Sequence, residues 1–419
     1  GIAVLSGKTS VLNLNGKKFS NENGYKENKA ALQVHGDLTI NGDGEVYCEG
    51  GANNNAIIVE QGGHLVINGG TYNVGANTNS GKSNATIFVQ SNGKPSLVEI
   101  NGGVFEAEVG SDGTPFVLNQ ADDLTVNCFS VKGGIFVGFN PAKVNENKGA
   151  ITSFVAEGYR SVKTKYEGKD AWKVEAIPPV TTQEELNAAI ADVAEGETAT
   201  VYLDAGEYDL IKSNCKGDIV VKGKDKATTI VRVPDESRGY DNKSISFENL
   251  TFNCENKFLG DKRESQFPRT DVHFTNCNIN GLFAAIGSTT TSFKECTFTA
   301  SDYAIKYYGG PEASKLIVEK CQFNTCGKGI LMFNEAAYTY AAEVVNCTFT
   351  ASATISGKAA VQMHTEKGIK GNLSIVGSTA TGFDSSINGG LWNEVNNNTK
   401  EHTTNFNVTV DGTPVQAAK

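Results

Sequence analysis

The sequence predicts an all-β chain built from two tandem right-handed parallel β-helices (solenoids), the second with a short N-terminal capping helix. Two kinds of short phrase recur along the chain, one in each half, and recurrence with insertions of variable length is typical of repeat architectures. Within the phrases apolar and polar residues alternate, which indicates strands with one buried face. A helical pattern occurs between the two halves.

The first half, residues 1–178, repeats a strand, a glycine turn and a second short strand. The copies are LTINGDGEV (38–46), LVINGGTYNV (65–74), VEINGGVFEA (98–107) and SVKGGIFVGF (130–139). Gly69 and Gly102 are 33 residues apart, and Gly102 and Gly133 are 31 apart. Asn-Gly and Gly-Gly supply the positive φ needed where a coil turns a corner. We therefore expect an N-terminal parallel β-helix with glycine-rich turns.

The segment between the halves predicts a break and a helix. The Pro-Pro pair at 178–179 marks the break. In the following TTQEELNAAIADV, a threonine precedes two glutamates in the way that an N-cap precedes an acidic first turn. We expect a helix near 182–194, then a strand at 200–203. This helix would close the exposed end of the core of a second β-helix over 179–419.

The second half repeats a phrase with a cysteine two residues before an apolar residue. The copies are HFTNCNI, SFKECTF, IVEKCQF and EVVNCTF, around Cys277, Cys296, Cys321 and Cys347. The intervals are 19, 25 and 26 residues, and SFENLTF has Leu250 in the cysteine's place. Strands this short cannot close a core alone, so we expect parallel stacking at about 4.8 Å with right-handed connections. The four cysteines should be buried, reduced core residues in consecutive coils.

Composition narrows the possible partners. The formal net charge is −10, so no basic stripe for nucleic acid is expected. No run of about 18 apolar residues exists, and no membrane span is expected.

Nine cysteines are an odd number, which argues against a disulfide scaffold. The five histidines show no paired metal spacing. The sequence predicts no metal site and no cofactor, and it leaves the oligomeric state open.

Several phrases resemble a known class of protein. LNLNGKKFS, LTINGDGEV, LVINGGTYNV and the block GGIFVGFNPA…SFVAEGYRSVK…AWKVEAI resemble secreted or surface right-handed β-helix proteins of gut Bacteroidetes. VTTQEELNAAIADVAEGETATVYLDAGEYDL is similar to the opening of domains in the pectin-lyase-like superfamily. The resemblance implies export and contact with glycans or a cell surface. This superfamily contains lyases, hydrolases, epimerases, adhesins and phage tail proteins, so the fold leaves the activity open.

Motifs of the superfamily's enzymes are missing. Asp122-Asp123 follows alanine rather than glycine, and His64 lies in GGHL rather than in Gly-His-Gly. The Trp-x-Asp-His phrase of pectate lyases and the calcium-binding Gly-Gly-x-Gly-x-Asp repeat are absent as well. No catalytic residue is predicted. A polysaccharide lyase or glycoside hydrolase stays open as an alternative, because one chain does not exclude a divergent site.

A candidate ligand-binding row follows from the strands after the cysteine phrases, YAIKYY, KGILMF and AAVQMH. If the second apolar residue of each points inward, period two turns another set outward. This outward set comprises Lys306, Tyr308, Leu331, Phe333, Gln362 and His364. We expect its rings to be exposed one coil apart, as a platform for sugar rings. A register slip of one residue would turn the whole row inward.

The alternative candidate is a charged insertion at 255–271. The insertion offers Asp261, Lys262, Arg263, Glu264, Arg269 and Asp271, and Asp235, Glu236 and Arg238 arrive one coil earlier. Long insertions on solenoids often form the binding face, although charge runs are usually solvated, salt-bridged loops.

The sequence thus predicts a non-enzymatic secreted or cell-surface protein that is adhesin-like or glycan-binding and uses the outer face of a β-helix. Its expected partner is a polysaccharide or a cell-surface glycan. A structural surface spacer, whose outer faces bind nothing specific, is a further alternative to the enzyme.

Overall fold

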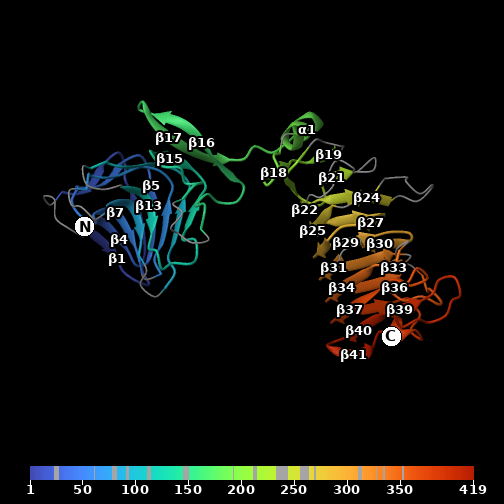
Figure 1. Ribbon diagram of the computed structural model, residues 1–419. Coiled ribbons are helices and arrows are strands. Elements are labelled where there is room, and N and C mark those ends of the chain that lie inside the picture. Colours follow the sequence, from blue (N-terminus) through green and yellow to red (C-terminus); the bar gives the residue numbers. More distant parts are fainter. Residues whose placement is uncertain are drawn as a thin grey trace. The chain divides into compact units, whose positions relative to one another are not determined.

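Parallel strands stacked coil upon coil make up most of the computed structural model of the protein. The structure describes residues 1–419 except 23–27, 61, 78–82, 91–93, 111–114, 145–150, 192, 211–214, 233–243, 255–263, 269, 310–313, 327, 334–335 and 352. The side chains of 264–268, 325 and 326 also lie outside this description. The described chain is all-β with one α-helix, and its strands form a β-solenoid of about 12 coils (Figure 1). The predicted stacking of parallel strands is confirmed.

The chain divides into two compact units, Gly1–Ile177 and Pro178–Lys419. The first unit has three sheets, each named here after one member strand. The β7 sheet contains β1 (Ile2–Val4), β4 (Ala30–Val34), β7 (Asn55–Val59), β10 (Ala85–Val89) and β13 (Phe116–Gln120); the β8 sheet contains β2 (Thr9–Asn13), β5 (Asp37–Asn41), β8 (His64–Ile67), β11 (Leu97–Ile100) and β14 (Phe129–Val131). The β9 sheet contains β3 (Lys18–Asn21), β6 (Glu45–Cys48), β9 (Thr71–Val74), β12 (Val104–Ala107) and β15 (Gly134–Val137), followed by the antiparallel pair β17 (Lys169–Ala176) and β16 (Tyr159–Tyr166).

The second unit also has three sheets, preceded by helix α1 (Gln183–Ala191). The β31 sheet contains β18 (Thr198–Leu203), β20 (Asp218–Gly223), β22 (Ser244–Glu248), β25 (Asp271–Thr275), β28 (Thr290–Lys294), β31 (Ser314–Glu319), β34 (Thr339–Val345), β37 (Lys370–Val376), β40 (Phe406–Val410) and the antiparallel β41 (Thr413–Gln416). The β29 sheet contains β19 (Gly206–Asp209), β21 (Thr229–Arg232), β23 (Thr251–Asn253), β26 (Asn278–Asn280), β29 (Thr297–Thr299), β32 (Gln322–Cys326), β35 (Thr348–Ala351) and β38 (Thr379–Thr381). The β30 sheet contains β24 (Glu264–Pro268), β27 (Leu282–Ile286), β30 (Tyr303–Gly309), β33 (Lys328–Met332), β36 (Val361–His364) and β39 (Trp392–Val395), with a 3-10 turn at Asn388–Gly390.

Helix α1 begins where the sequence predicts. Thr182 accepts a hydrogen bond at its hydroxyl from the Glu185 N–H (3.2 Å), and the Glu185 carboxylate accepts one from the Thr182 N–H (3.2 Å). This reciprocal pair is a capping box, which satisfies donors at the start of a helix. Leu186 and Ile190 are buried in the core of the second unit, so the helix packs its apolar side on the coils.

Register places equivalent side chains on top of one another inside the coils. In the second unit the rings of Phe247, Phe274 and Phe293 stack with centroids 4.9 and 5.2 Å apart. In the first unit Tyr72 and Phe105 stack at 4.9 Å. Such aromatic pairs contribute about 0.5–1.5 kcal/mol beyond their burial, which favours one register over its neighbours.

The recurring cysteines occupy one corner of the coils. Cys277, Cys296, Cys321 and Cys347 are each at most 1% exposed and unpaired, as predicted. The thiol of Cys277 is 3.4 Å from the Phe247 carbonyl oxygen of the preceding coil. Each thiol therefore packs as a small apolar group that also reaches a carbonyl.

The residue before each cysteine, or before Leu250 in the first copy, has a left-handed backbone conformation. Its φ is 55° at Asn249, 52° at Asn276, 56° at Glu295, 53° at Lys320 and 53° at Asn346. Asparagine tolerates this left-handed conformation better than most non-glycine residues. The corner therefore requires an unusual backbone, and the small buried side chain after it fills the space beneath.

We expect the buried thiols to react slowly with a thiol reagent in the native protein. The thiols of Cys277, Cys296, Cys321 and Cys347 are at most 1% exposed, so a reagent reaches them only when the fold opens. Burial also raises the pKa of the Cys277 thiol well above its ordinary value and that of Cys48 to about 11, and the thiolate is the reactive form. Labelling with a maleimide, followed by peptide mass spectrometry, should modify these cysteines only after urea is added. Rapid native labelling of Cys277, Cys296, Cys321 and Cys347 would contradict their placement.

Candidate functional site

The strands that carry the predicted ligand row pair in the expected register. Lys306 lies beside Leu331, and Leu331 beside Gln362, on β30, β33 and β36. The residues before them, Ile305, Ile330 and Val361, belong to the core. The predicted alternation is therefore present, and no slip turns the row toward the core.

The predicted exposure of this row is wrong. Gln362 is 1% exposed, and Lys306 and His364 are each 8% exposed. The reason is that the outer face of the β30 sheet has packing of its own. A second apolar cluster contains Leu282, Ala284, Tyr303 and Leu331, against which Ile286, Tyr308 and Phe333 pack. The outward side chains of this face thus pack against one another.

Tyr308 and Phe333 do not form an open platform. Both rings are half-buried, and they meet edge to face with centroids 6.0 Å apart and an interplanar angle of 68°. Gly309, with φ of 58°, follows Tyr308 at an irregularity of the β27–β30 ladder. A sugar could contact the free parts of these rings, but it could not stack on a continuous row.

A polar corner lies beside this apolar cluster. The Lys328 ammonium is 2.5 Å from the Asp302 carboxylate and 4.7 Å from the centroid of the Tyr303 ring. Tyr303 is 5% exposed, and its hydroxyl has no hydrogen-bond partner among the described residues. The sequence motifs did not single out Asp302, Tyr303 or Lys328, although Tyr303 and Lys328 are paired in register one coil apart.

His364 is a neutral imidazole at the end of β36, two coils from Tyr303 in the same sheet. Burial is the main reason that the pKa of His364 is lowered to about 4. The carboxylate of Glu366 opposes this shift, and the ammonium groups of Lys358, Lys400 and Lys328 add to it. Its Nε2 atom is buried and has no partner within the described part of the chain. Burial lowers the pKa of Lys358, and the positive charge of Lys328 lowers it further. Several basic groups therefore lie near one another.

Gln362 has partners on both sides. Its Nε2 donates to the Ala359 carbonyl at 3.0 Å, and its Oε1 accepts from Asn393 Nδ2 at 3.4 Å. The amide is therefore held in one orientation on the outer face of the coil. Gln362 and His364 lie on β36, and Tyr303 lies two coils away on β30, all on the outer face of the same sheet.

The alternative charged site falls largely outside the described residues. Asp235, Arg238, Asp261, Arg263 and Arg269 lie there, as does the side chain of Glu264. Asp271 is described, and its carboxylate accepts from the N–H groups of Thr289 (2.8 Å) and Thr290 (2.9 Å). Asp271 therefore holds the start of the next coil, a structural role.

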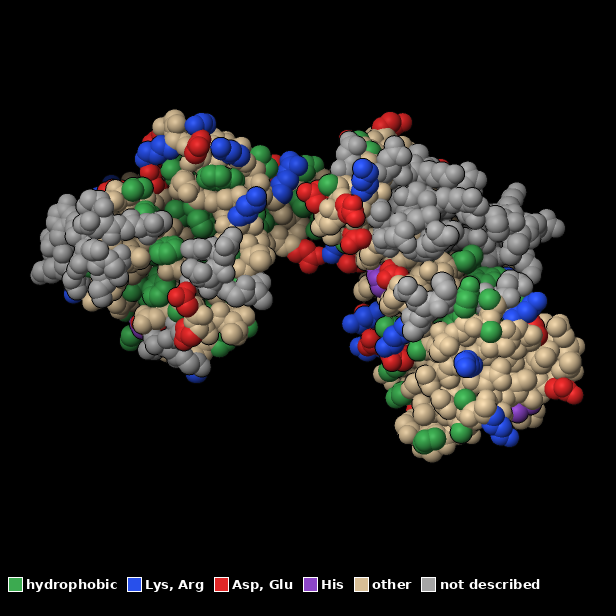
Figure 2. All heavy atoms as spheres, viewed as in Figure 1, with side chains coloured by type: hydrophobic (Ala, Val, Ile, Leu, Met, Phe, Trp, Pro, Cys, Tyr) green, Lys and Arg blue, Asp and Glu red, His purple; other side chains and the backbone are tan. Residues whose placement is uncertain are grey.

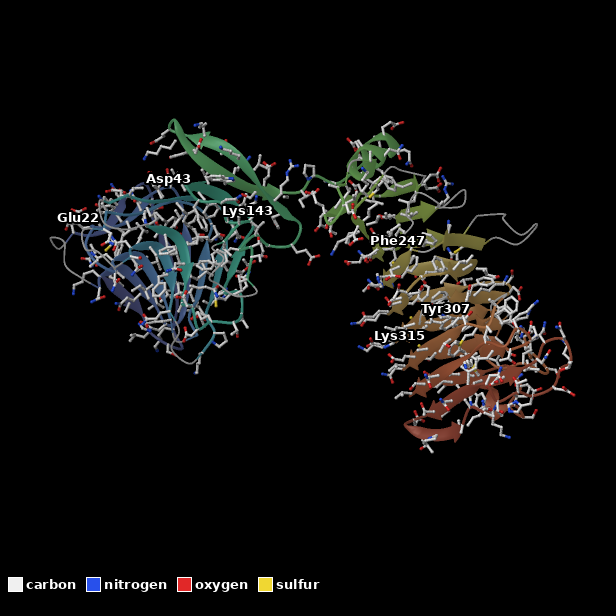
Figure 3. All side chains as sticks on the ribbon, viewed as in Figure 1. Glu22, Asp43, Lys143, Phe247, Tyr307 and Lys315 are labelled. Atoms are coloured by element: carbon white, nitrogen blue, oxygen red, sulfur yellow. The ribbon has the colours of Figure 1, made fainter. Side chains whose placement is uncertain are left out.

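The outer face of the β31 sheet carries exposed ion pairs. Lys315 is 2.8 Å from Glu343, and Lys320 is 3.7 Å from Glu295. Figure 2 shows red and blue side chains side by side at this edge of the second unit, and Figure 3 labels Lys315 there and Tyr307 within the stack. Exposed pairs of this kind contribute about 0–1 kcal/mol each and indicate a solvated surface.

One carboxylate in the first unit has two basic neighbours. Glu99 is 2.9 Å from Lys132 and 3.0 Å from His64. The hydrogen bonds from Lys132 and then His64 hold its pKa below the ordinary value. A general acid in glycoside hydrolysis needs a raised pKa, so this arrangement fits an ion-pair network better than acid catalysis.

Among the described residues no three His, Cys, Asp or Glu side chains gather in a way that could hold a metal ion. Within the same part of the chain, no helix is long and apolar enough to cross a membrane. Comparison with protein-family models and with curated proteins finds no match for this sequence.

Proposed function

We propose that the protein binds a glycan, without turning it over, at the outer face of the β30 sheet. The observation that supports this proposal is a set of three buried polar side chains on this outer face, Tyr303, Gln362 and His364. These side chains point away from the core, yet each is at least nine-tenths buried. Two of their polar atoms, Tyr303 Oη and His364 Nε2, lack partners among the described residues. Unsatisfied buried polar atoms are rare in native proteins and call for an explanation such as a ligand or an ordered water.

The chemistry of the corner favours a saccharide with an acidic group. Lys358 supplies positive charge beside the Lys328–Asp302 ion pair, and the neutral His364 and the Tyr303 hydroxyl supply hydrogen-bonding groups for sugar hydroxyls. The half-buried rings of Tyr308 and Phe333 offer an apolar edge to the same ligand. Lys306 lies in the adjoining row of the sheet. This arrangement replaces the open aromatic platform as the proposed binding surface.

We also propose that the two compact units are tandem right-handed β-helices and that α1 caps the second. The capping box and the burial of Leu186 and Ile190 support this role for the helix. The resemblance of the repeat phrases to pectin-lyase-like surface proteins supports a secreted or cell-surface location. A polysaccharide lyase or glycoside hydrolase and a structural spacer remain the rival functions, and the experiment below separates them.

The Tyr303→Phe substitution tests the proposal. It removes only the hydroxyl that lacks a partner, so the free energy of unfolding should stay the same or rise. If the hydroxyl binds ligand, affinity for an acidic oligosaccharide should fall by about tenfold, or about 1.4 kcal/mol. The assay is calorimetric titration of oligogalacturonate and other acidic and neutral glycans, with product release followed in parallel.

Tyr208→Phe is the matched control. The Tyr208 hydroxyl donates to the Val180 carbonyl at 2.9 Å in a buried position. Its loss should lower the free energy of unfolding by about 1 kcal/mol and leave binding unchanged. Unchanged affinity in Tyr303→Phe would refute the site. Product release would support the enzyme, and absence of binding to every glycan would support the spacer.

A further inference from the structure

The first unit carries a groove on the outer face of its β7 sheet. The groove has a volume of about 560 Å³. Its lining comes from successive coils and includes Gln33, Ile58, Glu60, Phe88, Gln90 and Asn119. The sequence patterns did not single out the residues that line this groove. They belong to the first unit, whereas Tyr303 belongs to the second.

Register builds the floor of this groove. Gln33 pairs with Ile58, Ile58 with Phe88, and Phe88 with Asn119, on β4, β7, β10 and β13. The flanking positions in these strands point into the core, whereas these four side chains are half-buried. Adjacent strands lie about 4.8 Å apart. The floor is therefore a row of two apolar side chains with an amide at each end.

A second row forms one side of the groove. Glu60 is 3.6 Å from the Nε2 atom of His35, and both side chains are about 15% exposed (15% and 16%). Asn119 lines the groove, and its Oδ1 atom is buried with no hydrogen-bond partner in the described part of the chain. A polar atom left in this state beside a cavity points to a ligand or water that would satisfy it.

Asparagines hold the other side in place. Asn53 Nδ2 donates to Asn28 Oδ1 at 3.0 Å, and Asn55 Nδ2 donates to the Asn53 carbonyl at 3.1 Å. Asn55 Oδ1 in turn accepts from the Ala85 N–H at 3.2 Å. All three asparagines line the groove, and their mutual bonds reduce the entropy lost when a ligand is bound.

We infer that this groove binds a neutral oligosaccharide. Amide side chains both donate and accept, which suits sugar hydroxyls, and the Phe88 and Ile58 side chains suit the apolar face of a pyranose ring. The described lining contains no lysine or arginine and one carboxylate, Glu60, so an acidic sugar is disfavoured. The groove is thus a second site whose ligand preference is opposite to that of the Tyr303 corner.

The test uses the full-length protein and calorimetric titration of four neutral probes: cello-, xylo-, manno- and malto-oligosaccharides. At least one should bind, and Phe88→Ala should weaken its binding by about tenfold or more. Gln33→Ala, which removes an amide and leaves the ring, should weaken binding by severalfold. Glu60→Gln should raise the affinity of oligogalacturonate for the groove, because the repelling charge is gone.

Two controls make the outcome decisive. Val66→Ala changes a half-buried residue on the outer face of the neighbouring β8 sheet and should leave neutral-sugar binding intact. Tyr303→Phe should also leave it intact, since that residue belongs to the other unit. Failure of all four probes to bind would overturn the inference. Binding that survives both Phe88→Ala and Gln33→Ala would overturn it as well, as would binding that is lost only in Tyr303→Phe.

Discussion

Replacing Glu394 with alanine is expected to lower the free energy of unfolding of the second unit by about 3–5 kcal/mol. Glu394 is fully buried. Its carboxylate accepts from the Thr403 hydroxyl (2.9 Å), the Phe406 N–H (3.1 Å), Gln416 Nε2 (2.6 Å) and the Asn405 N–H. The alanine variant would remove the acceptor that these donors share. The buried Phe406 N–H and the half-buried Asn405 N–H would lose it, whereas Gln416 Nε2 still donates to the Phe406 carbonyl at 3.0 Å and the Thr403 hydroxyl still lies 2.6 Å from that of Thr365. Each such loss costs about 1–3 kcal/mol when water cannot reach the group.

The damage should be local to the last coils. The four donors belong to the segment that leads into β40 and to the terminal strand β41, so Glu394 ties the end of the chain to β39. A solenoid contacts only its neighbouring coils, and fraying should therefore begin at this end. Hydrogen-exchange mass spectrometry should show lost protection at residues 392–416, while β20 and β22 keep theirs.

Glu343→Ala is the matched comparison, because it removes a glutamate whose side chain is 45% exposed and paired with Lys315. That change should cost at most about 1 kcal/mol. Glu394→Gln keeps the size but presents an amide N–H to donors, so its cost should be intermediate. Equal urea midpoints for Glu394→Ala and Glu343→Ala would show that the four donors find other partners.

The parts of the fold that sequence could predict are those set by local pattern. The cysteine phrase predicts a buried small side chain, and the structure adds why an asparagine often precedes it: φ is positive at Asn249, Asn276 and Asn346. The strand register after Cys296, Cys321 and Cys347 follows from alternation alone. These features depend on a few neighbouring residues, so one chain suffices to predict them.

The candidate sites depended on contacts between coils, which alternation does not specify. Period two correctly turned Gln362 and His364 away from the core, but their burial depends on the turns and side chains that pack over them. The groove in the first unit joins Gln33, Phe88 and Asn119, which lie on three strands of different coils, β4, β10 and β13. No short phrase marks such a set, because its members become neighbours only when the coils stack.

Stability should fall as the pH is lowered from about 6.5 to about 4, and His364 should account for about 2–3 kcal/mol of that loss. Burial is the main cause of its low folded-state pKa of about 4, compared with 6.5 for an unperturbed histidine. Between these values the unfolded chain binds the proton and the folded chain does not, so protons favour unfolding. The contribution is fully present above about pH 6.5, and below about pH 4 it changes no further.

Urea unfolding of the wild type and of His364→Gln at pH 7.5 and pH 4.5 measures this contribution. Glutamine does not titrate, so the variant should lose about 2 kcal/mol less stability than the wild type over this interval. His273, whose pKa is also lowered by burial, is present in both proteins and cancels in the comparison. If the two pH profiles coincide, His364 is accessible to protons in the folded state. The corner around Tyr303 would then be open to water, and its unpartnered atoms would no longer argue for a ligand.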